Sequence, residues 1–401
     1  MDTITKLNNI ENELNTYFVE RQNEVHGLIL GLISGSNVLL IGPPGTAKSM
    51  LVSSWAKTLD KSKYFSWQLH QFSTPEELFG PYSLALLEED RYVRMTEGKL
   101  PSADVAFIDE IFKCSHGNLN AMLSILNERV FFNDGKATPL DLNCVVGASN
   151  EIPEDGDHLE AFMDRFSLKY VVDPIVENEN FSKMLTNTEI FYPNTLVTME
   201  ELQKVSQDIS EVVLGEDLVS VLIELRAKLS TSLPGTKNSD KALSMPVTDR
   251  MFRFAVRILK AEAWLNGRTH VSPDDFEILQ HVLWSDPSDR SKMYSTILEV
   301  INPDKDKIMQ LYYDSEEIYT KLKKESSSLK TDKDKKAIEP KAFETAQKLR
   351  NSKGKISEYI SDLEKKGRNV GDLKPILAKV DNMLNDLYEK TLGTVGFKGW
   401  D

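Results

Sequence analysis

A short segment rich in glycine and proline, 42–49 (GPPGTAKS), constrains the fold of this chain more than any other feature. It follows the apolar run 37–41 (NVLLI) and precedes a helical pattern over 47–59. A buried strand, a tight glycine turn and a helix N-terminus in this order let backbone N–H groups converge on phosphate oxygens. The sequence therefore predicts a strand–loop–helix unit that binds the phosphates of a nucleotide.

The residues of this loop and the one that follows are assigned to nucleotide binding: Gly42, Pro43, Pro44, Gly45, Thr46, Ala47, Lys48, Ser49 and Met50. Lys48 can reach the β- and γ-phosphates and is also given a catalytic role, while Ser49 can ligate Mg²⁺. Ala47 stands where such loops usually carry glycine. Because alanine disfavours positive φ angles, we expect a negative φ at this position.

A second apolar run, 105–108, ends in two carboxylates, Asp109 and Glu110. A buried parallel strand delivers them to the carboxyl edge of the sheet, where ligands bind in open α/β folds. There Asp109 would hold Mg²⁺ and Glu110 would polarise the attacking water as a general base. Taken alone, such a pair can also be two solvated acids after a strand, but the phosphate loop in the same chain weighs against that alternative.

Asn150 ends a further apolar run and is the candidate for orienting water near the γ-phosphate. Asn after a strand is also common turn chemistry, so the residue by itself is a weak signal.

Apolar runs that alternate with helical patterns predict an α/β core with a central parallel sheet covered on both faces. The expected strands are 37–41, 64–69, 104–108, 142–148 and 168–172. Residues 1–36 are expected to be helical. Segments 82–100 and 130–141 are expected to form hairpin insertions, the second because Asp134-Gly135 is a strong turn signal.

Beyond about residue 175 the strand signals stop and the patterns are helical. Helices are expected over 199–231, 247–265 and 273–284, with Ser272 as the N-cap of the last and Pro273 at its first position.

From about residue 290 the composition shifts toward Lys, Glu, Asp and Ser, and 330–336 (KTDKDKK) is expected to be either a solvated helix or a flexible linker, with a solvated linker favoured over a nucleic-acid contact. An amphipathic pattern returns over 341–392. We therefore expect a nucleotide-binding core over 1–175, an all-α lid domain over 176–288 and a helical C-terminal extension over 289–401.

Composition narrows the class of protein. The chain has 401 residues and a net charge of −14, which argues against nucleic-acid binding because that requires a positive surface. Its two cysteines form no Cys-x-x-Cys pair, no run of about 18 apolar residues predicts a membrane span, and the N-terminus lacks an apolar signal core. These features predict a cytoplasmic protein.

The order of phosphate loop, acidic strand and Asn-tipped strand resembles that of the AAA+ ATPases, and within them the MoxR family and its RavA-type branch. The resemblance covers about residues 1–285, and the alanine before Lys48 also looks like the MoxR pattern. The phrases that carry it are GPPGTAKS (42–49), FSTPEELFGP (72–81), FIDEIFK (107–113), LNAMLSILNER (119–129), ASNEIPE (148–154), LEAFMDRF (159–166) and VTDRMFRFAVRILKAEAWLNGRTHVSPDDF (247–276).

The resemblance implies further site residues. Arg165 matches the arginine finger that enters the site of a neighbouring subunit, and Arg250 matches the second sensor arginine of the lid. Without the resemblance, Arg165 would be read as a helix-end arginine that caps carbonyl groups. The roles of Arg129 and His70 stay open. Residues 19–21 lie where such proteins form the edge of the adenine pocket.

A finger in trans implies a homo-oligomer, and by resemblance a ring of six with ATP and Mg²⁺ at each interface. The resemblance implies an ATP hydrolase that remodels, matures or regulates client proteins, often with a partner that carries a von Willebrand factor A (vWA) domain. No Asp-x-Ser-x-Ser motif occurs here, so such a partner would be a separate chain. A nucleic-acid-linked AAA+ motor and a nucleotide-gated scaffold are the alternative functions.

Overall fold

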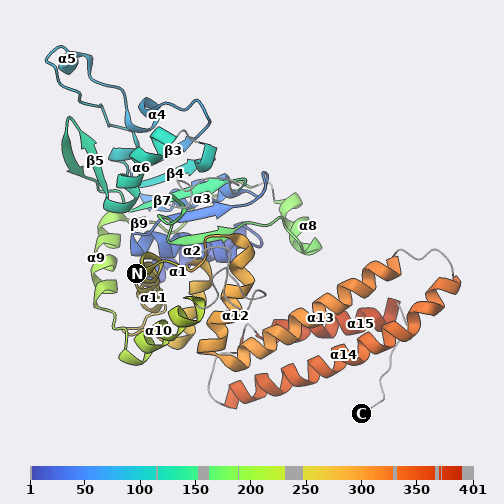
Figure 1. Cartoon of the computed structure of the whole chain (residues 1–401). Helices are drawn as coiled ribbons and strands as arrows, with labels where there is room; N and C mark the ends of the chain where they lie inside the picture. Colours follow the sequence, from blue (N-terminus) through green and yellow to red (C-terminus); the bar gives the residue numbers. More distant parts are fainter. Residues whose placement is uncertain are drawn as a thin grey trace. The chain divides into compact units, whose positions relative to one another are not determined.

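The computed structural model describes residues 2–113, 116–151, 162–187, 189–230, 247–327, 332–365, 370–371 and 373–390. It divides into two compact units, residues 1–297 and 298–401. The first unit contains the sheet and the lid helices, and the second contains three long helices (Figure 1).

A five-stranded parallel sheet forms the centre of the first unit, with the strand order β3-β4-β7-β1-β8. Its strands are β1 (Val38–Ile41), β3 (Tyr64–Gln68), β4 (Val105–Asp109), β7 (Cys144–Ser149) and β8 (Leu168–Val171). Val38 pairs with Val146 on one side and with Leu168 on the other, so β1 lies between β7 and β8. All five expected strands are confirmed, with ends within two residues of the expected ones.

Both faces of the sheet are buried, which explains why its strands are continuously apolar. Leu39, Ile41 and Ile108 point into one apolar cluster, which also takes in residues of helix α6 (His116–Glu128). The alternate residues, such as Val38 and Leu40, are equally buried. Because side chains alternate across a strand, burial on both faces requires apolar residues at successive positions.

Two helices precede the sheet where one helical stretch, 1–36, was expected. They are α1 (Thr3–Tyr17) and α2 (Gln22–Ser34), and the chain turns between them with a φ of 56° at Glu20. The Glu20 carboxylate accepts hydrogen bonds from the N–H groups of Val176 and Glu177. The interruption therefore serves a contact with a segment far away in the sequence.

The two insertions lie side by side at one end of the sheet (Figure 1). The second is the expected hairpin, with β5 (Val130–Asn133) and β6 (Lys136–Pro139) joined through Asp134–Gly135. The first folds back through an isolated bridge between Tyr82 and Arg94 and carries a short helix, α5 (Leu84–Leu87), at its tip.

Side chains of the hairpin turn join the two insertions. Asp134 Oδ1 accepts from the N–H of Tyr92, and Asn133 Oδ1 accepts from the N–H of Arg94.

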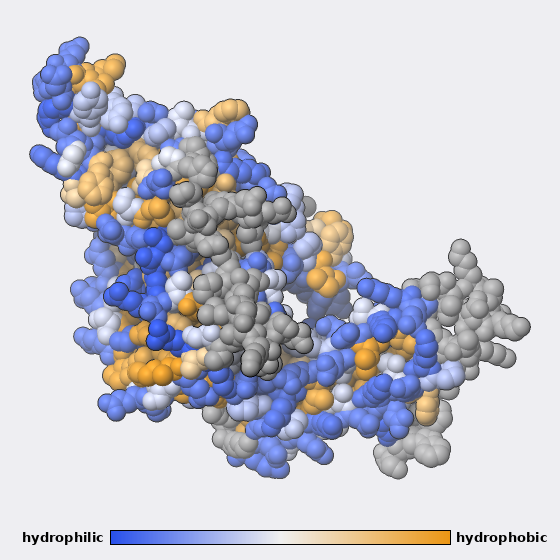
Figure 2. All heavy atoms as spheres, viewed as in Figure 1, coloured by the Kyte–Doolittle hydropathy of each residue, from blue (hydrophilic) through white to orange (hydrophobic). Residues whose placement is uncertain are grey.

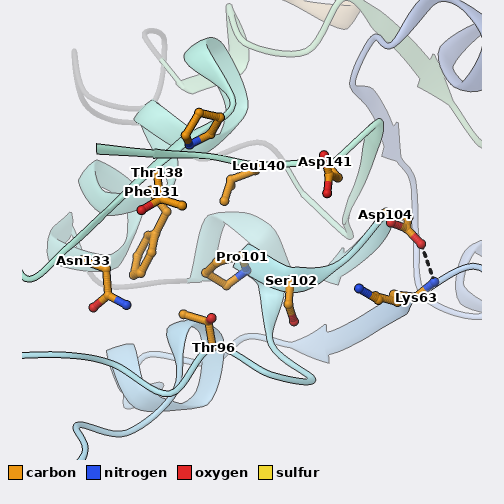
Figure 3. A pocket seen from close by; sticks show the side chains of 11 residues that line it. Lys63, Thr96, Pro101, Ser102, Asp104, Phe131, Asn133, Thr138, Leu140 and Asp141 are labelled. Carbon is orange, nitrogen blue, oxygen red and sulfur yellow. Dashed lines mark hydrogen bonds between the residues drawn. The ribbon is translucent and has the colours of Figure 1, made fainter. Parts of the chain in front are cut away.

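A cavity of about 240 Å³ lies between these insertions and the amino edge of β3 and β4 (Figure 3). Thr96, Phe131 and Leu140 line it on the side of the insertions, and Ser102 and Asp104 line it near β4. The phosphate loop follows the carboxyl end of β1, at the opposite edge of the parallel sheet, so this cavity is not the nucleotide site.

The remaining elements of the core are α3 (Lys48–Ala56), β2 (Leu59–Asp60), α4 (Pro75–Phe79), η1 (Leu100–Ser102) and η2 (Ile111–Lys113). The expectation that strands end at about residue 175 is wrong in one place, because a two-residue strand, β9 (Val197–Thr198), pairs with β2. This pairing joins the start of the lid to the core.

The lid is helical, as expected. The elements between the sheet and the second unit are α8 (Asn178–Thr186), α9 (Met199–Glu211), α10 (Glu216–Ser230), α11 (Asp249–Leu265), η4 (Pro273–His281), η5 (Pro287–Asp289) and α12 (Arg290–Ile301). The expected helix 199–231 is two helices, and the expected helix 273–284 is a shorter 3₁₀ helix. Ser272 precedes it as the N-cap, with its N–H donating to Asp275 Oδ2 at 2.7 Å.

Helix α8 exposes its apolar side chains. Phe181, Met184 and Leu185 are spaced by three and four residues, so they share one face, and none of the residues of α8 is buried. The apolar patch is visible on the surface of the first unit (Figure 2).

The second unit comprises α13 (Pro303–Ser327), α14 (Asp332–Lys365) and α15 (Leu373–Lys390). Its buried residues form two apolar clusters, one around Ile308, Ile356 and Val380 and one around Leu349 and Leu384. Of the two alternatives for 330–336, the helix holds for residues 332–336, which open α14, whereas 330 and 331 lie outside the described residues.

In the part of the chain that the structure describes, no helix combines the length and the apolar character needed to cross a membrane.

Candidate nucleotide site

The phosphate loop connects β1 to α3 at the carboxyl edge of the sheet, as the sequence predicts. A Cβ atom at Gly42 would lie 2.2 Å from the carbonyl oxygen of Val172, so only glycine fits there. Gly45 has a φ of 84°, and a Cβ atom on it would meet nothing within 4 Å. The top of the loop is therefore open, with room for a ligand against its backbone.

The expectation of a negative φ at Ala47 is wrong, because its φ is 65° and its ψ is 20°. Ala47 is the residue before the first turn of α3, and its carbonyl oxygen accepts from the N–H of Leu51. The chain must turn sharply between loop and helix here, and the left-handed conformation achieves this. Alanine tolerates it at a cost of about 1–2 kcal/mol.

The Lys48 side chain is buried against the loop. Its Nζ donates to the carbonyl oxygens of Gly42 at 2.6 Å and Pro43 at 3.0 Å. It also donates to Asn150 Oδ1 at 3.0 Å, which links the loop to the end of β7. Burial lowers the pKa of Lys48, and the nearby carboxylates of Asp109 and Glu110 oppose that effect.

The acidic pair meets the loop at the same edge. Ser49 Oγ donates to Asp109 Oδ2 at 2.8 Å, although the two residues are 60 positions apart. Glu110 is buried, with a φ of 53°, and its carboxylate accepts from the Asn150 amide and pairs with Lys113 at 3.2 Å. The structure therefore brings Lys48, Ser49, Asp109, Glu110 and Asn150 together.

This arrangement fits ATP and Mg²⁺. The open backbone at Gly45, followed by the N-terminus of α3, presents N–H groups and a partial positive charge to an anion. Ser49 and Asp109 place a hydroxyl and a carboxylate oxygen side by side. Mg²⁺ is commonly held by one or two such oxygens together with the phosphate oxygens of the nucleotide.

Arg165 and Arg250 lie at the other edge of the sheet. Arg165 precedes β8, whose first residue pairs with the first residue of β1, so it stands at the amino edge. The strands between the two edges are four to six residues long. At about 3.3 Å per residue they separate the edges by roughly 13 Å or more. The two arginines are therefore remote from the phosphate loop of their own chain.

A single carboxylate organises these two arginines. Asp164 pairs with Arg165 at 3.2 Å, pairs with Arg250 and accepts from Thr248 Oγ1 at 3.0 Å. Burial, and then the charge of Arg250, lowers the pKa of Arg165, while Asp164 opposes the shift. The sequence patterns predicted no role for Asp164. Its position next to Arg165 in the phrase AFMDRF was the signal that could have identified it.

Arg129 and His70, whose roles the sequence leaves open, differ in their surroundings. Arg129 is directed into the protein, where its guanidinium donates to carbonyl oxygens of Ile125, Leu126, Gly35 and Asn143 and to Asn37 Oδ1. Burial, and then the charge of Arg257, lowers its pKa to about 10. His70 is exposed, and its Nδ1 accepts from the N–H of Phe72 within a local turn.

The expected adenine edge lies against the loop. Arg21 is buried and donates to the carbonyl oxygens of Thr46 at 3.4 Å and Asp173 at 2.7 Å. Arg21 thus joins the phosphate loop to the segment that leads into the lid.

Relatives of this chain are found by sequence. The model of the "MoxR domain in the MoxR-vWA-beta-propeller ternary systems" matches residues 5–214, and that of an "AAA lid domain" matches residues 217–297. An uncharacterized protein of Methanocaldococcus jannaschii is 36% identical over 321 residues, which cover 80% of each chain. A second uncharacterized protein of that organism is 35% identical over 300 residues, 74% of this chain and 76% of the relative.

Two further proteins are more distantly similar to this chain. A protein named as a structural protein of Acidianus two-tailed virus is 28% identical over 252 residues, 59% of this chain and 41% of the viral one. A crystal structure from Cytophaga hutchinsonii, of a protein provisionally named as an ATPase, superposes with a TM-score of 0.59 and 21% identity over 75% of this chain and 95% of that one. It supports the fold alone. With the MoxR domain matched over more than half of its length, the chain belongs to the MoxR family of AAA+ ATPases.

Proposed function

We propose that this protein hydrolyses ATP with Mg²⁺ at the interfaces of a ring, of six subunits by the resemblance, and that hydrolysis remodels or regulates partner proteins. In this proposal Lys48 binds the β- and γ-phosphates, Ser49 and Asp109 hold the cation, Glu110 activates water and Asn150 orients it. Arg165 and Arg250 of the neighbouring subunit stabilise the charge that develops on the transferred phosphoryl group.

One observation carries this proposal. The phosphate loop and its carboxylates lie at the carboxyl edge of the sheet, whereas Arg165 and Arg250 lie at the amino edge. One chain therefore has the phosphate loop at one edge of the sheet and Arg165 and Arg250 at the opposite edge. A head-to-tail arrangement of copies joins the two halves, and such an arrangement closes into a ring when its rotation permits.

Mixing two inactive variants tests this arrangement. Glu110→Gln removes the base and Arg165→Ala removes the finger, so turnover should fall at least about 10²-fold in the first variant and about 10³-fold in the second. In an equal mixture, about one quarter of random interfaces join an intact Glu110 to an intact Arg165. We therefore expect the mixture to recover about one quarter of the wild-type rate of phosphate release.

The controls are each variant mixed with itself, and Lys204→Ala, which alters an exposed basic residue of α9 outside the site. A mixture no more active than its components would refute an active site shared between subunits.

A nucleotide-gated scaffold is the competing function, and the Glu110→Gln variant separates it from the motor. Because Glu110 pairs with Asn150 and Lys113 and the loop contacts are made by other residues, the variant should still bind ATP. A motor then loses its effect on partners, whereas a scaffold keeps it. A fluorescent ATP analogue measures binding in the same samples.

The proposed partner is a separate protein with a vWA domain, because the matched family description names MoxR-vWA-beta-propeller systems. Membership of the RavA-type branch and a cytoplasmic location stay predictions from the sequence.

A further inference from the structure

A cavity of about 540 Å³ at the amino edge of the sheet is lined by five arginines. They are Arg129, Arg165, Arg250, Arg253 and Arg257. Three of them come from α11 at positions 250, 253 and 257, and spacings of three and four residues place them on one face of that helix. Among the described residues the lining includes one acidic side chain, Glu128.

The five arginines are not equivalent. Arg129 is committed to carbonyl groups, and Arg165 and Arg250 share the carboxylate of Asp164. Arg253 and Arg257 are exposed and make no hydrogen bond or ion pair with the residues that the structure describes. Two guanidinium groups thus line the cavity without an ion pair to any residue that the structure describes, next to the two arginines assigned to the reaction.

Like charges that line one cavity repel one another, and an anion bound between them relieves that repulsion. Guanidinium groups suit phosphate oxygens in particular, because their planar fork donates two parallel hydrogen bonds. The anion that the proposed function brings to this edge is the triphosphate on the loop of the neighbouring copy.

We infer that Arg253 and Arg257 form, with Arg165 and Arg250, a wall that holds the triphosphate of the ATP bound by the next subunit. This inference rests on the proposed function, since it requires that subunits share sites. Arg253 lies one helical turn from Arg250 and is expected to contribute more than Arg257, which lies two turns away.

Directed mixing isolates the contribution of Arg253. In an equal mixture of Arg165→Ala and Glu110→Gln, the active interfaces join the loop of the first variant to the arginines of the second. Adding Arg253→Ala to the Glu110→Gln chain removes Arg253 from every active arginine wall. We expect phosphate release to fall about 10- to 100-fold relative to the parent mixture, as for the loss of a charge-assisted hydrogen bond.

The reciprocal mixture is the matched control. Arg253→Ala placed instead in the Arg165→Ala chain alters only the subunit that supplies the loop, so the rate should not change. Arg253→Lys in the Glu110→Gln chain keeps the charge without the fork and should recover part of the rate. Lys204→Ala in the same chain, which removes an exposed basic side chain of α9 outside the cavity, should have no effect.

The outcomes separate the two claims. If the parent mixture recovers no activity, the shared site of the proposed function fails. If it recovers and Arg253→Ala in the Glu110→Gln chain leaves the rate unchanged, the inference is overturned while the shared site stands. The inference is also overturned if the loss occurs only when Arg253→Ala is in the chain that supplies the loop. That outcome would assign the arginines a role within their own subunit.

Discussion

At the scale of single residues, the phosphate loop and the acidic pair each hold one non-glycine residue in the left-handed conformation, Ala47 and Glu110. Such conformations cost free energy and persist where surrounding contacts impose them. At Ala47 the sharp turn of the chain from the phosphate loop into α3 requires this conformation. At Glu110 the backbone N–H donates to Asp109 Oδ1 at 2.9 Å, and this contact ties the turn to the neighbouring carboxylate.

Replacing Ala47 by Gly should stabilise the protein. The left-handed conformation costs alanine about 1–2 kcal/mol, and glycine removes this cost. Glycine also loses more conformational entropy on folding, which offsets about 0.5–1 kcal/mol of the stabilisation. We expect a net increase of about 0.5–1 kcal/mol in the free energy of unfolding, measured with urea. Ala255→Gly, within α11, should instead cost about 1 kcal/mol or more. Equal losses in both variants would contradict the strain at Ala47.

At the scale of elements, one histidine joins three helices. His26 of α2 contacts Glu11 of α1 at 3.0 Å and Glu262 of α11 at 2.7 Å. Burial disfavours the charged imidazole, but the hydrogen bonds and charges of the two glutamates outweigh it and raise the pKa of His26 to about 10. Because α11 belongs to the lid and α1 and α2 to the core, this charged trio holds the lid against the core.

The stabilisation by His26 should depend on pH. Its pKa is higher in the folded chain than the value of 6.5 expected when unfolded, so the folded state binds the proton more tightly. The contribution is fully present below about pH 6.5 and is lost as the pH rises toward 10. We expect the free energy of unfolding, measured with urea, to be about 1–2 kcal/mol higher for wild type than for His26→Gln at pH 6. At pH 10 the difference should be much smaller.

The control for this prediction is His270→Gln, which alters an exposed histidine of the same unit. A difference between wild type and His26→Gln that stays constant from pH 6 to 10 would argue against a charged His26.

At the scale of the whole molecule, two units have separate cores. The buried apolar residues of the second unit, from Ile308 to Leu387, cluster among α13, α14 and α15. The sheet and lid carry their own buried residues. Since each unit buries its apolar side chains within itself, each is expected to fold without the other.

A chain shortened to residues 1–302, which keeps α12, should therefore fold and bind ATP. We expect ATP affinity within about threefold of the full chain, because the site residues all lie in the first unit and the loss of a separate unit leaves their contacts intact. Calorimetry of ATP binding and a single thermal transition test this. An aggregated or unfolded product would show that the second unit completes the fold of the first.

Much of the fold was predictable because its signals are local. Burial on both faces of a parallel sheet demands continuous apolar runs, and all five strands followed from them. The grouping of Lys48, Ser49, Asp109 and Glu110 was also predictable, since parallel strands present their carboxyl ends at one edge. Residue spacing alone could not predict the split at Glu20 or the pairing of β9 with β2, which depend on partners more than 100 positions away.

The sequence by itself thus determined the sheet, the phosphate loop and the identity of the residues at its edge. Only the tertiary structure decided that Ala47 adopts a positive φ, that Asp164 pairs with an arginine 86 positions away, and that Arg253 and Arg257 face the same cavity as Arg165. The reason is physical. Strand and helix patterns arise from the burial and backbone preferences of neighbouring residues, whereas charge pairing and strain arise where distant segments are packed together.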